Sequence, residues 1–65
     1  MSAEEHDILY YMENYQNDDG FISSKGLYNK LYNNTKLSKK TIYRIIKKLI
    51  DKGKILKETE GFILN

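Results

Sequence analysis

Apolar side chains recur at intervals of three and four residues in three segments of the chain, which is the spacing of one face of an α-helix. The segments are residues 3–16, 25–32 and 38–52. Their apolar positions are Ile8, Tyr11, Met12 and Tyr15, then Leu27, Tyr28, Leu31 and Tyr32, and finally Ile42, Ile45, Ile46, Leu49 and Ile50. The pattern predicts three amphipathic helices whose apolar faces share one core.

Small polar residues mark where these helices begin. Ser2 is followed three residues later by Glu5, a pair that forms a capping box in which each side chain satisfies a free backbone N–H group. Ser23 or Ser24 caps the second helix, and Ser38 is the expected N-cap of the third.

Three shorter apolar segments have the character of strands. Phe21 and Ile22 lie between a turn and the second helix, and residues 54–57 and 62–64 follow Gly53, which ends the third helix. Residues 58–61 connect the last two strands as a hairpin, with Gly61 supplying permissive backbone dihedrals. The sequence therefore predicts one domain over residues 1–65, mainly α with a small β-hairpin, in the order helix, strand, helix, helix, strand, strand.

Charge changes the picture of the third helix. Nine of the 11 basic residues lie within residues 36–57, where Asp51 is the single acid. This window carries +8, whereas residues 1–35 carry −4 and the last eight residues carry −2, so the chain totals only +2. A helix that is apolar on one side and cationic on the other is typical of contact with nucleic acid, an anionic membrane or an acidic protein.

A helical wheel separates the two faces of this helix. With 100° per residue, the isoleucine and leucine side chains fall on one side and the cations on the other. The polar face presents Lys40, Thr41, Arg44, Lys47 and Lys48, with Tyr43 at its border. Arg44 is the only arginine, so it is the best candidate for a forked contact to a guanine or a phosphate.

The pattern Leu37-Ser38-x-x-Thr41-Ile42-x-Arg44-x-Ile46-x-x-Leu49-x-x-x-Gly53-x-Ile55 resembles the recognition-helix half of the winged helix-turn-helix superfamily. The likeness is to small prokaryotic regulators of the MarR and GntR type, and the order of elements agrees over essentially the whole chain. The resemblance implies a role for each polar residue of this segment. Ser38, Lys39, Lys40, Thr41, Tyr43 and Arg44 would approach the major groove of DNA, and Lys47 and Lys48 the phosphate backbone.

Two features depart from that family's pattern. Residues 32–37 are longer than the usual tight turn. Either the second helix runs on, or a loop meets the phosphates through Asn33, Asn34 and Lys36. The predicted hairpin would be the wing of such a fold, and its tip carries Glu58 and Glu60, which phosphates would repel. It is therefore expected to stay off the DNA or to meet a basic partner.

These observations favour a double-stranded-DNA-binding protein, expected to act as a homodimer in transcriptional regulation or in replication or partition control. The alternatives are an adaptor that docks an acidic protein and an RNA-binding protein. A membrane surface is disfavoured because the apolar stripe is needed for the core. No catalytic arrangement, cofactor motif or metal-ligand set is recognisable, and the chain has no cysteine. A cytoplasmic, nucleoid-associated location and an A/T-rich prokaryotic, phage or plasmid source are expected.

Overall fold

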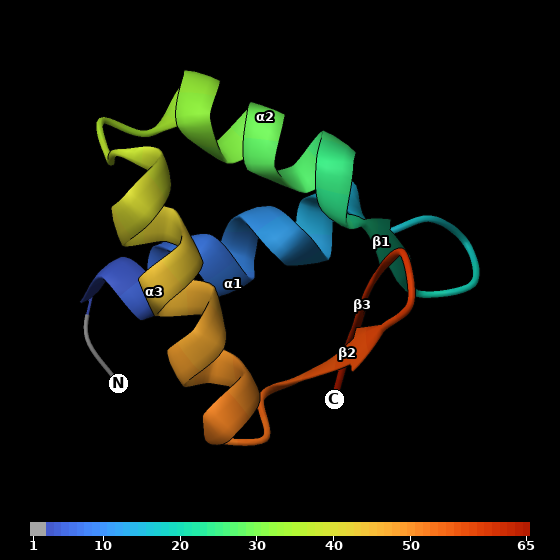
Figure 1. Ribbon diagram of the computed structural model, residues 1–65. Helices are drawn as coiled ribbons and strands as arrows, with labels where there is room; N and C mark the ends of the chain where they lie inside the picture. The colour runs from blue at the N-terminus through green and yellow to red at the C-terminus, as the bar shows by residue number, and fades with distance from the viewer. Residues whose placement is uncertain (1–2) are drawn as a thin grey trace.

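The computed structural model of the protein describes residues 3–65. It contains helices α1 (Ala3–Tyr15), α2 (Ser24–Asn34) and α3 (Lys39–Asp51), and strands β1 (Phe21–Ser23), β2 (Ile55–Glu58) and β3 (Gly61–Leu64). Figure 1 shows these elements in the order α1-β1-α2-α3-β2-β3 along the chain. The predicted fold class is confirmed, and the order is consistent with a winged-helix layout.

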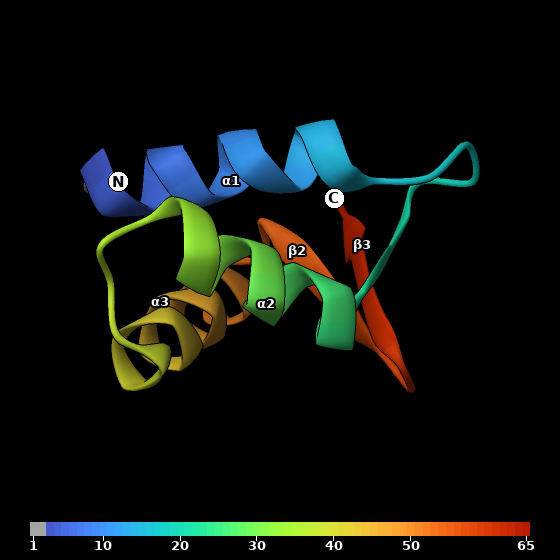
Figure 2. The ribbon, with the colours of Figure 1, turned by 90° about the horizontal axis from the view of Figure 1, so that it is seen from above.

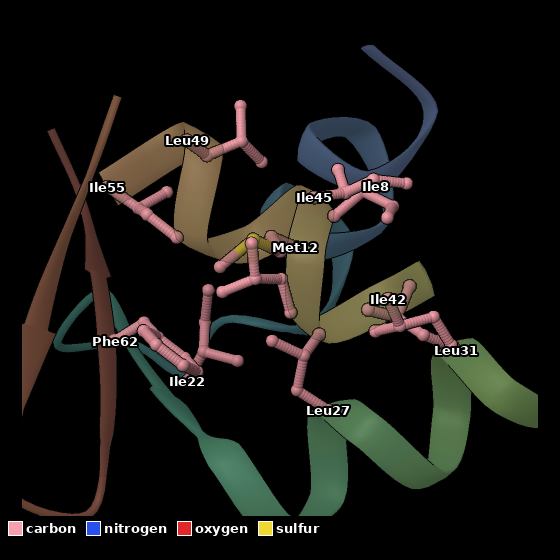
Figure 3. Packing of buried hydrophobic residues seen from close by; sticks show 11 residues of the cluster. Ile8, Met12, Ile22, Leu27, Leu31, Ile42, Ile45, Leu49, Ile55 and Phe62 are labelled. Carbon is pink, nitrogen blue, oxygen red and sulfur yellow. The ribbon is translucent and has the colours of Figure 1, made fainter. Parts of the chain in front are cut away.

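The apolar faces of the three helices meet as the spacing predicts, except that Tyr32 is 50% exposed, and the sheet closes one end of the core. Figure 2 shows the sheet at the end of α2 that is remote from the α2–α3 turn. Figure 3 shows side chains from all three helices pointing into one space together with side chains from the strands. The buried apolar residues are Ile8, Met12, Ile22, Leu27, Leu31, Ile42, Ile45, Ile46, Leu49, Ile55 and Phe62. Full burial of such a side chain contributes about 1.5–3 kcal/mol.

The three strands form one antiparallel sheet in the order β1-β3-β2. The last strand is therefore the central one: Ile22 of β1 and Lys57 of β2 both lie opposite Phe62 of β3. Gly61 was expected to supply a permissive dihedral, and this was wrong, because the only positive φ angles in residues 3–65 belong to Gly20 and Gly53. What Gly61 provides is space, since a Cβ there would overlap the carbonyl oxygen of Ile22.

Helix α2 runs two residues beyond its predicted end at Tyr32. The hydroxyl of Thr35 donates to the Leu31 carbonyl at 2.6 Å, and the Thr35 backbone N–H bonds the same oxygen at 2.9 Å. These bonds satisfy the last turn of the helix. At the other end, Ser23 occupies the N-cap position without a side-chain capping bond.

Helix α3 has the predicted boundaries. Ser38 caps its start, and Gly53, with φ of 73°, follows its end. The Gly53 N–H bonds the Ile50 carbonyl at 3.0 Å and the Lys54 N–H bonds the Leu49 carbonyl at 2.9 Å. This pair of bonds is the Schellman arrangement, which requires a residue with positive φ.

The predicted capping box of Ser2 and Glu5 at the start of α1 stays a prediction. Ser2 lies outside the described residues, and the Glu5 carboxylate is buried against α3, where Lys52 Nζ lies 2.9 Å from Oε2 and 3.1 Å from Oε1. The hydrogen bond from Lys52 lowers the pKa of Glu5, and this outweighs the opposing effect of desolvation. The pair therefore ties α1 to the end of α3.

Candidate nucleic-acid interface

The start of α3 is fixed by its cap. Ser38 Oγ accepts a hydrogen bond from the Thr41 backbone N–H at 3.2 Å and donates to Thr41 Oγ1 at 3.0 Å. Thr41 is half-buried. Because its hydroxyl oxygen is the acceptor in the bond from Ser38, the proton of the Thr41 hydroxyl remains available to donate. Both predicted residues are thus in place at the helix start, where a groove-binding helix makes base contacts.

The two faces of α3 divide as the helical wheel predicts. Ile42 and Leu49 are fully buried, and Ile45 and Ile46 retain 4% and 2% exposure. Ile50 is only half-buried, at the edge of the stripe. The exposed side chains on the other faces of the helix are Lys39, Lys40, Tyr43, Arg44, Lys47, Lys48 and, at its last residue, the single acid Asp51. One side of the helix is therefore committed to the core, and the cationic side faces solvent.

The cationic face consists of Lys40, Arg44 and Lys47, with Lys39 and Lys48 beside it. None of these side chains forms an ion pair with a residue in the range 3–65. The charge of Lys48 contributes, after Lys52, to lowering the pKa of Glu5 of α1. The unneutralised charges on one exposed face form a local positive field that attracts polyanions.

The turn before α3 presents fewer polar side chains for phosphate contact than the alternative loop would have. Because α2 continues to Asn34, the Asn34 side-chain amide donates to the Lys30 carbonyl at 2.8 Å, and the Asn34 carbonyl accepts from the Tyr11 hydroxyl at 3.4 Å. Asn33 and Lys36 remain exposed. Of the three predicted phosphate contacts in this segment, Asn33 and Lys36 are freely presented, whereas Asn34 is partly engaged.

Tyr43 lies at the border of the two faces, as predicted. Its side chain is 55% exposed, and its ring packs at a tilt of 40° against that of Tyr28 of α2, with 4.4 Å between centroids. Partial burial raises the pKa of the Tyr28 hydroxyl, and Tyr43 adds to that rise. This aromatic pair joins α2 to α3 at the edge of the cationic face.

The wing tip is anchored in a way that the sequence does not reveal. The Glu60 carbonyl accepts from the Ser24 backbone N–H at 3.1 Å and from the Ser24 hydroxyl at 3.2 Å. The tip therefore folds against the start of α2, as Figure 1 shows, with the side chains of Glu58 and Glu60 exposed there. A backbone acceptor carries no residue-type signal, so only the serine at position 24 hinted at this contact.

Comparison with protein-family models, with curated proteins and with solved structures finds no match to this chain. Within residues 3–65, no helix is long and apolar enough to cross a membrane. The same part of the chain contains no group of three or more His, Cys, Asp or Glu residues placed to hold a metal ion.

Proposed function

We propose that this chain is a small winged-helix protein that binds double-stranded DNA through α3, as a homodimer on a two-fold site. Its role would be in transcriptional regulation or in the control of replication or partition. The resemblance of residues 37–55 to the winged helix-turn-helix superfamily supports this proposal, and so does the order of elements.

The observation that carries the proposal is the exposed cationic face of α3, whose opposite side is buried. A major groove about 12 Å wide admits one helix. Lys40 and Arg44 lie in the N-terminal half of α3, where base edges are usually contacted, and Lys47 and Lys48 follow toward the phosphates. Lys36 precedes the helix on the exposed turn and supplies a further phosphate contact.

The wing plays no part in this contact. Glu58 and Glu60 would be repelled by phosphates, and the tip is held to the start of α2 through Ser24. The proposed interface is therefore confined to α3 and the turn that precedes it.

The test is a titration of duplex DNA across salt concentrations with wild-type protein and the Arg44→Ala and Lys40→Ala variants. With about five phosphates neutralised, log K should fall with log salt with a slope of about −4 to −5. Arg44→Ala should cost about 1–3 kcal/mol if the guanidinium forks a guanine. Lys40→Ala removes a cation from the same base-contacting end of α3 and should also weaken duplex binding.

The matched control is Lys30→Ala, which removes the same charge from α2. Lys30 Nζ lies 4.4 Å from the centroid of the Tyr15 ring, away from the α3 face. Wild-type affinity and slope in both α3 variants would refute α3 as the reading helix. Failure of every duplex to bind below roughly 100 µM would favour docking of an acidic protein instead. Tighter binding of structured RNA in competition would favour the RNA alternative.

The homodimer is tested by molar mass in solution, with and without a palindromic duplex. Two half-sites one helical turn apart would each receive one α3, so two chains per duplex are expected. A single chain on a saturated palindrome would contradict the two-fold arrangement and leave monomeric binding.

A further inference from the structure

The aromatic pair of Tyr28 and Tyr43 rests on the core. The two rings are tilted by 40° at a centroid distance of 4.4 Å, and Tyr28 in turn meets Phe62 edge-on, with centroids 6.2 Å apart. Phe62 is 1% exposed, whereas Tyr43 is 55% exposed. An aromatic ring is thus presented to solvent on a base of two further rings, which restricts its motion before anything binds.

Open hollows flank this pair on both sides. One, of about 190 Å³, lies between α2 and α3, and the other, of about 370 Å³, lies between α3 and the sheet. Lysine side chains line both, and no acidic side chain from residues 3–65 lines either of them. The lysines are Lys25 and Lys39 in the first hollow, and Lys47 and Lys57 in the second.

The lysines of α3 are placed symmetrically about the exposed ring. Lys39 and Lys47 stand four residues before and four residues after Tyr43 in the sequence. Side chains four residues apart are neighbours on one side of a helix. The exposed ring therefore has a cation above and a cation below it along the helix.

The exposed tyrosine on α1 has a different environment. Tyr10 is 65% exposed and borders a hollow of about 490 Å³, which two acids, Glu4 and Asp7, line together with one cation, Lys36. Those carboxylates would repel phosphates. Exposure of an aromatic ring alone does not distinguish the two sites, whereas the charge around each ring does.

We propose that the Tyr28–Tyr43 pair is a stacking site for an unpaired nucleobase of single-stranded DNA, with Lys39 and Lys47 holding the phosphates on either side. Every base has a π-face, so stacking on an aromatic side chain in a cationic setting tolerates any sequence. Bases within a duplex are already stacked on their neighbours. The site therefore selects unpaired nucleotides, which goes beyond duplex binding by α3 and does not depend on it.

The test measures the affinity of a short labelled single strand of mixed sequence by fluorescence anisotropy. Loss of one base-stacking contact in Tyr43→Ala should weaken binding between about 5-fold and about 150-fold. Tyr43→Phe keeps the ring and should bind as wild type does. Tyr10→Ala removes an equally exposed ring from α1 and should also match wild type. Equal affinity of Tyr43→Ala and Tyr43→Phe would overturn the proposal.

A second measurement uses wild-type protein alone, so it does not depend on how the variants fold. A strand that contains 5-iodouracil is irradiated in the complex, and the cross-linked peptide is located by mass spectrometry. Attachment to Tyr43 or Tyr28 supports the stacking site, and attachment confined to Tyr10 contradicts it. A ribonucleotide strand that binds more tightly than the DNA strand would overturn the assignment to DNA.

The same strand annealed to its complement separates this proposal from duplex binding. Duplex affinity without affinity for the single strand refutes the stacking site and leaves the function proposed for α3 standing. Affinity for the single strand alone, lost in Tyr43→Ala, supports the stacking site and refutes duplex binding by α3.

Discussion

At the scale of single residues, Glu5 is the one charged side chain that the fold buries within residues 3–65. Its partner, Lys52, is 46% exposed, so solvent screens part of their attraction. The arrangement nevertheless favours the ionised carboxylate, since the pKa of Glu5 is lowered from its ordinary value of 4.5.

The stability of the fold should therefore depend on pH through Glu5. A carboxyl group whose pKa is lowered by folding contributes stability above its unfolded-state pKa, and this contribution disappears as pH falls through the folded-state value. Glu5→Gln should lower the melting temperature near pH 7 and flatten the loss of stability below about pH 4.5. Glu13→Gln, at an exposed position on the same helix, is the control. Identical pH profiles for Glu5→Gln and wild type would show that the pair has no role in acid unfolding.

Gly61 and Gly26 allow a comparison between a glycine with no room for a Cβ and one with room for it. A Cβ at Gly61 would overlap the Ile22 carbonyl and approach the ring of Phe21, whereas a Cβ at Gly26 would meet nothing within 4 Å. Gly61→Ala should destabilise the protein by about 1–3 kcal/mol through overpacking. Gly26→Ala lies within α2 and should stabilise it by about 0.4–1 kcal/mol. Urea unfolding of both variants checks the two signs, and destabilisation of equal size in both would contradict this account.

At the scale of elements, the N-cap serines of α2 and α3 differ in whether their side chains form a capping hydrogen bond. Ser38 receives a hydrogen bond from the backbone of Thr41, while Ser23 has no capping bond. Ser38→Ala should cost about 0.5–2 kcal/mol. Ser23→Ala should stay within about 0.5 kcal/mol of wild type, because the side chain is exposed and makes no capping contact. Thermal unfolding measured by circular dichroism compares them, and a larger effect at Ser23 would be inconsistent with the assigned caps.

The elements predicted best are those fixed by local pattern. The stripe from Ile42 to Leu49 and the cap at Ser38 determine α3 without help from the rest of the chain, so its boundaries and its exposed face were both predictable. The end of α2 was predicted at Tyr32, with a continuation of the helix as the stated alternative, because Asn33 and Asn34 have the character of helix breakers. The side chain of Asn34 instead bonds back to the helix at Lys30, and the helix continues.

What escaped prediction depends on partners distant in sequence. The burial of Glu5 needs Lys52, which lies 47 positions away in the sequence, and the wing tip needs Ser24. The contact between the rings of Tyr43 and Tyr28 also joins two helices. The sequence placed Tyr43 at a border but held no information on which neighbour would meet it there.

At the scale of the whole molecule, stability depends on a small number of core side chains. A domain of this length buries about 60% of the surface of its unfolded chain, so its free energy of unfolding is small. Phe62 belongs to the central strand, lies opposite Ile22, and contacts Tyr28 edge-on. It therefore connects the sheet to the helices.

Truncation of the Phe62 side chain should remove much of the free energy of unfolding. Phe62→Ala should cost about 3–5 kcal/mol, which is comparable with the total stability of a small domain. Phe62→Leu, which retains most of the apolar volume, should cost distinctly less. Denaturation by urea gives both values. A cost below about 1 kcal/mol for Phe62→Ala would mean that the sheet is not integral to the core.

The position of β3 between β1 and β2 has a consequence for biosynthesis. A ribosome makes all three helices before it makes Gly61–Leu64, yet neither β1 nor β2 has its pairing strand until those residues emerge. A nascent chain stalled before Gly61 would hold Ile22 and Ile55 without the strand that joins them. We expect such a chain to be cleaved by proteases, and protection should arise only once Phe62 has left the exit tunnel.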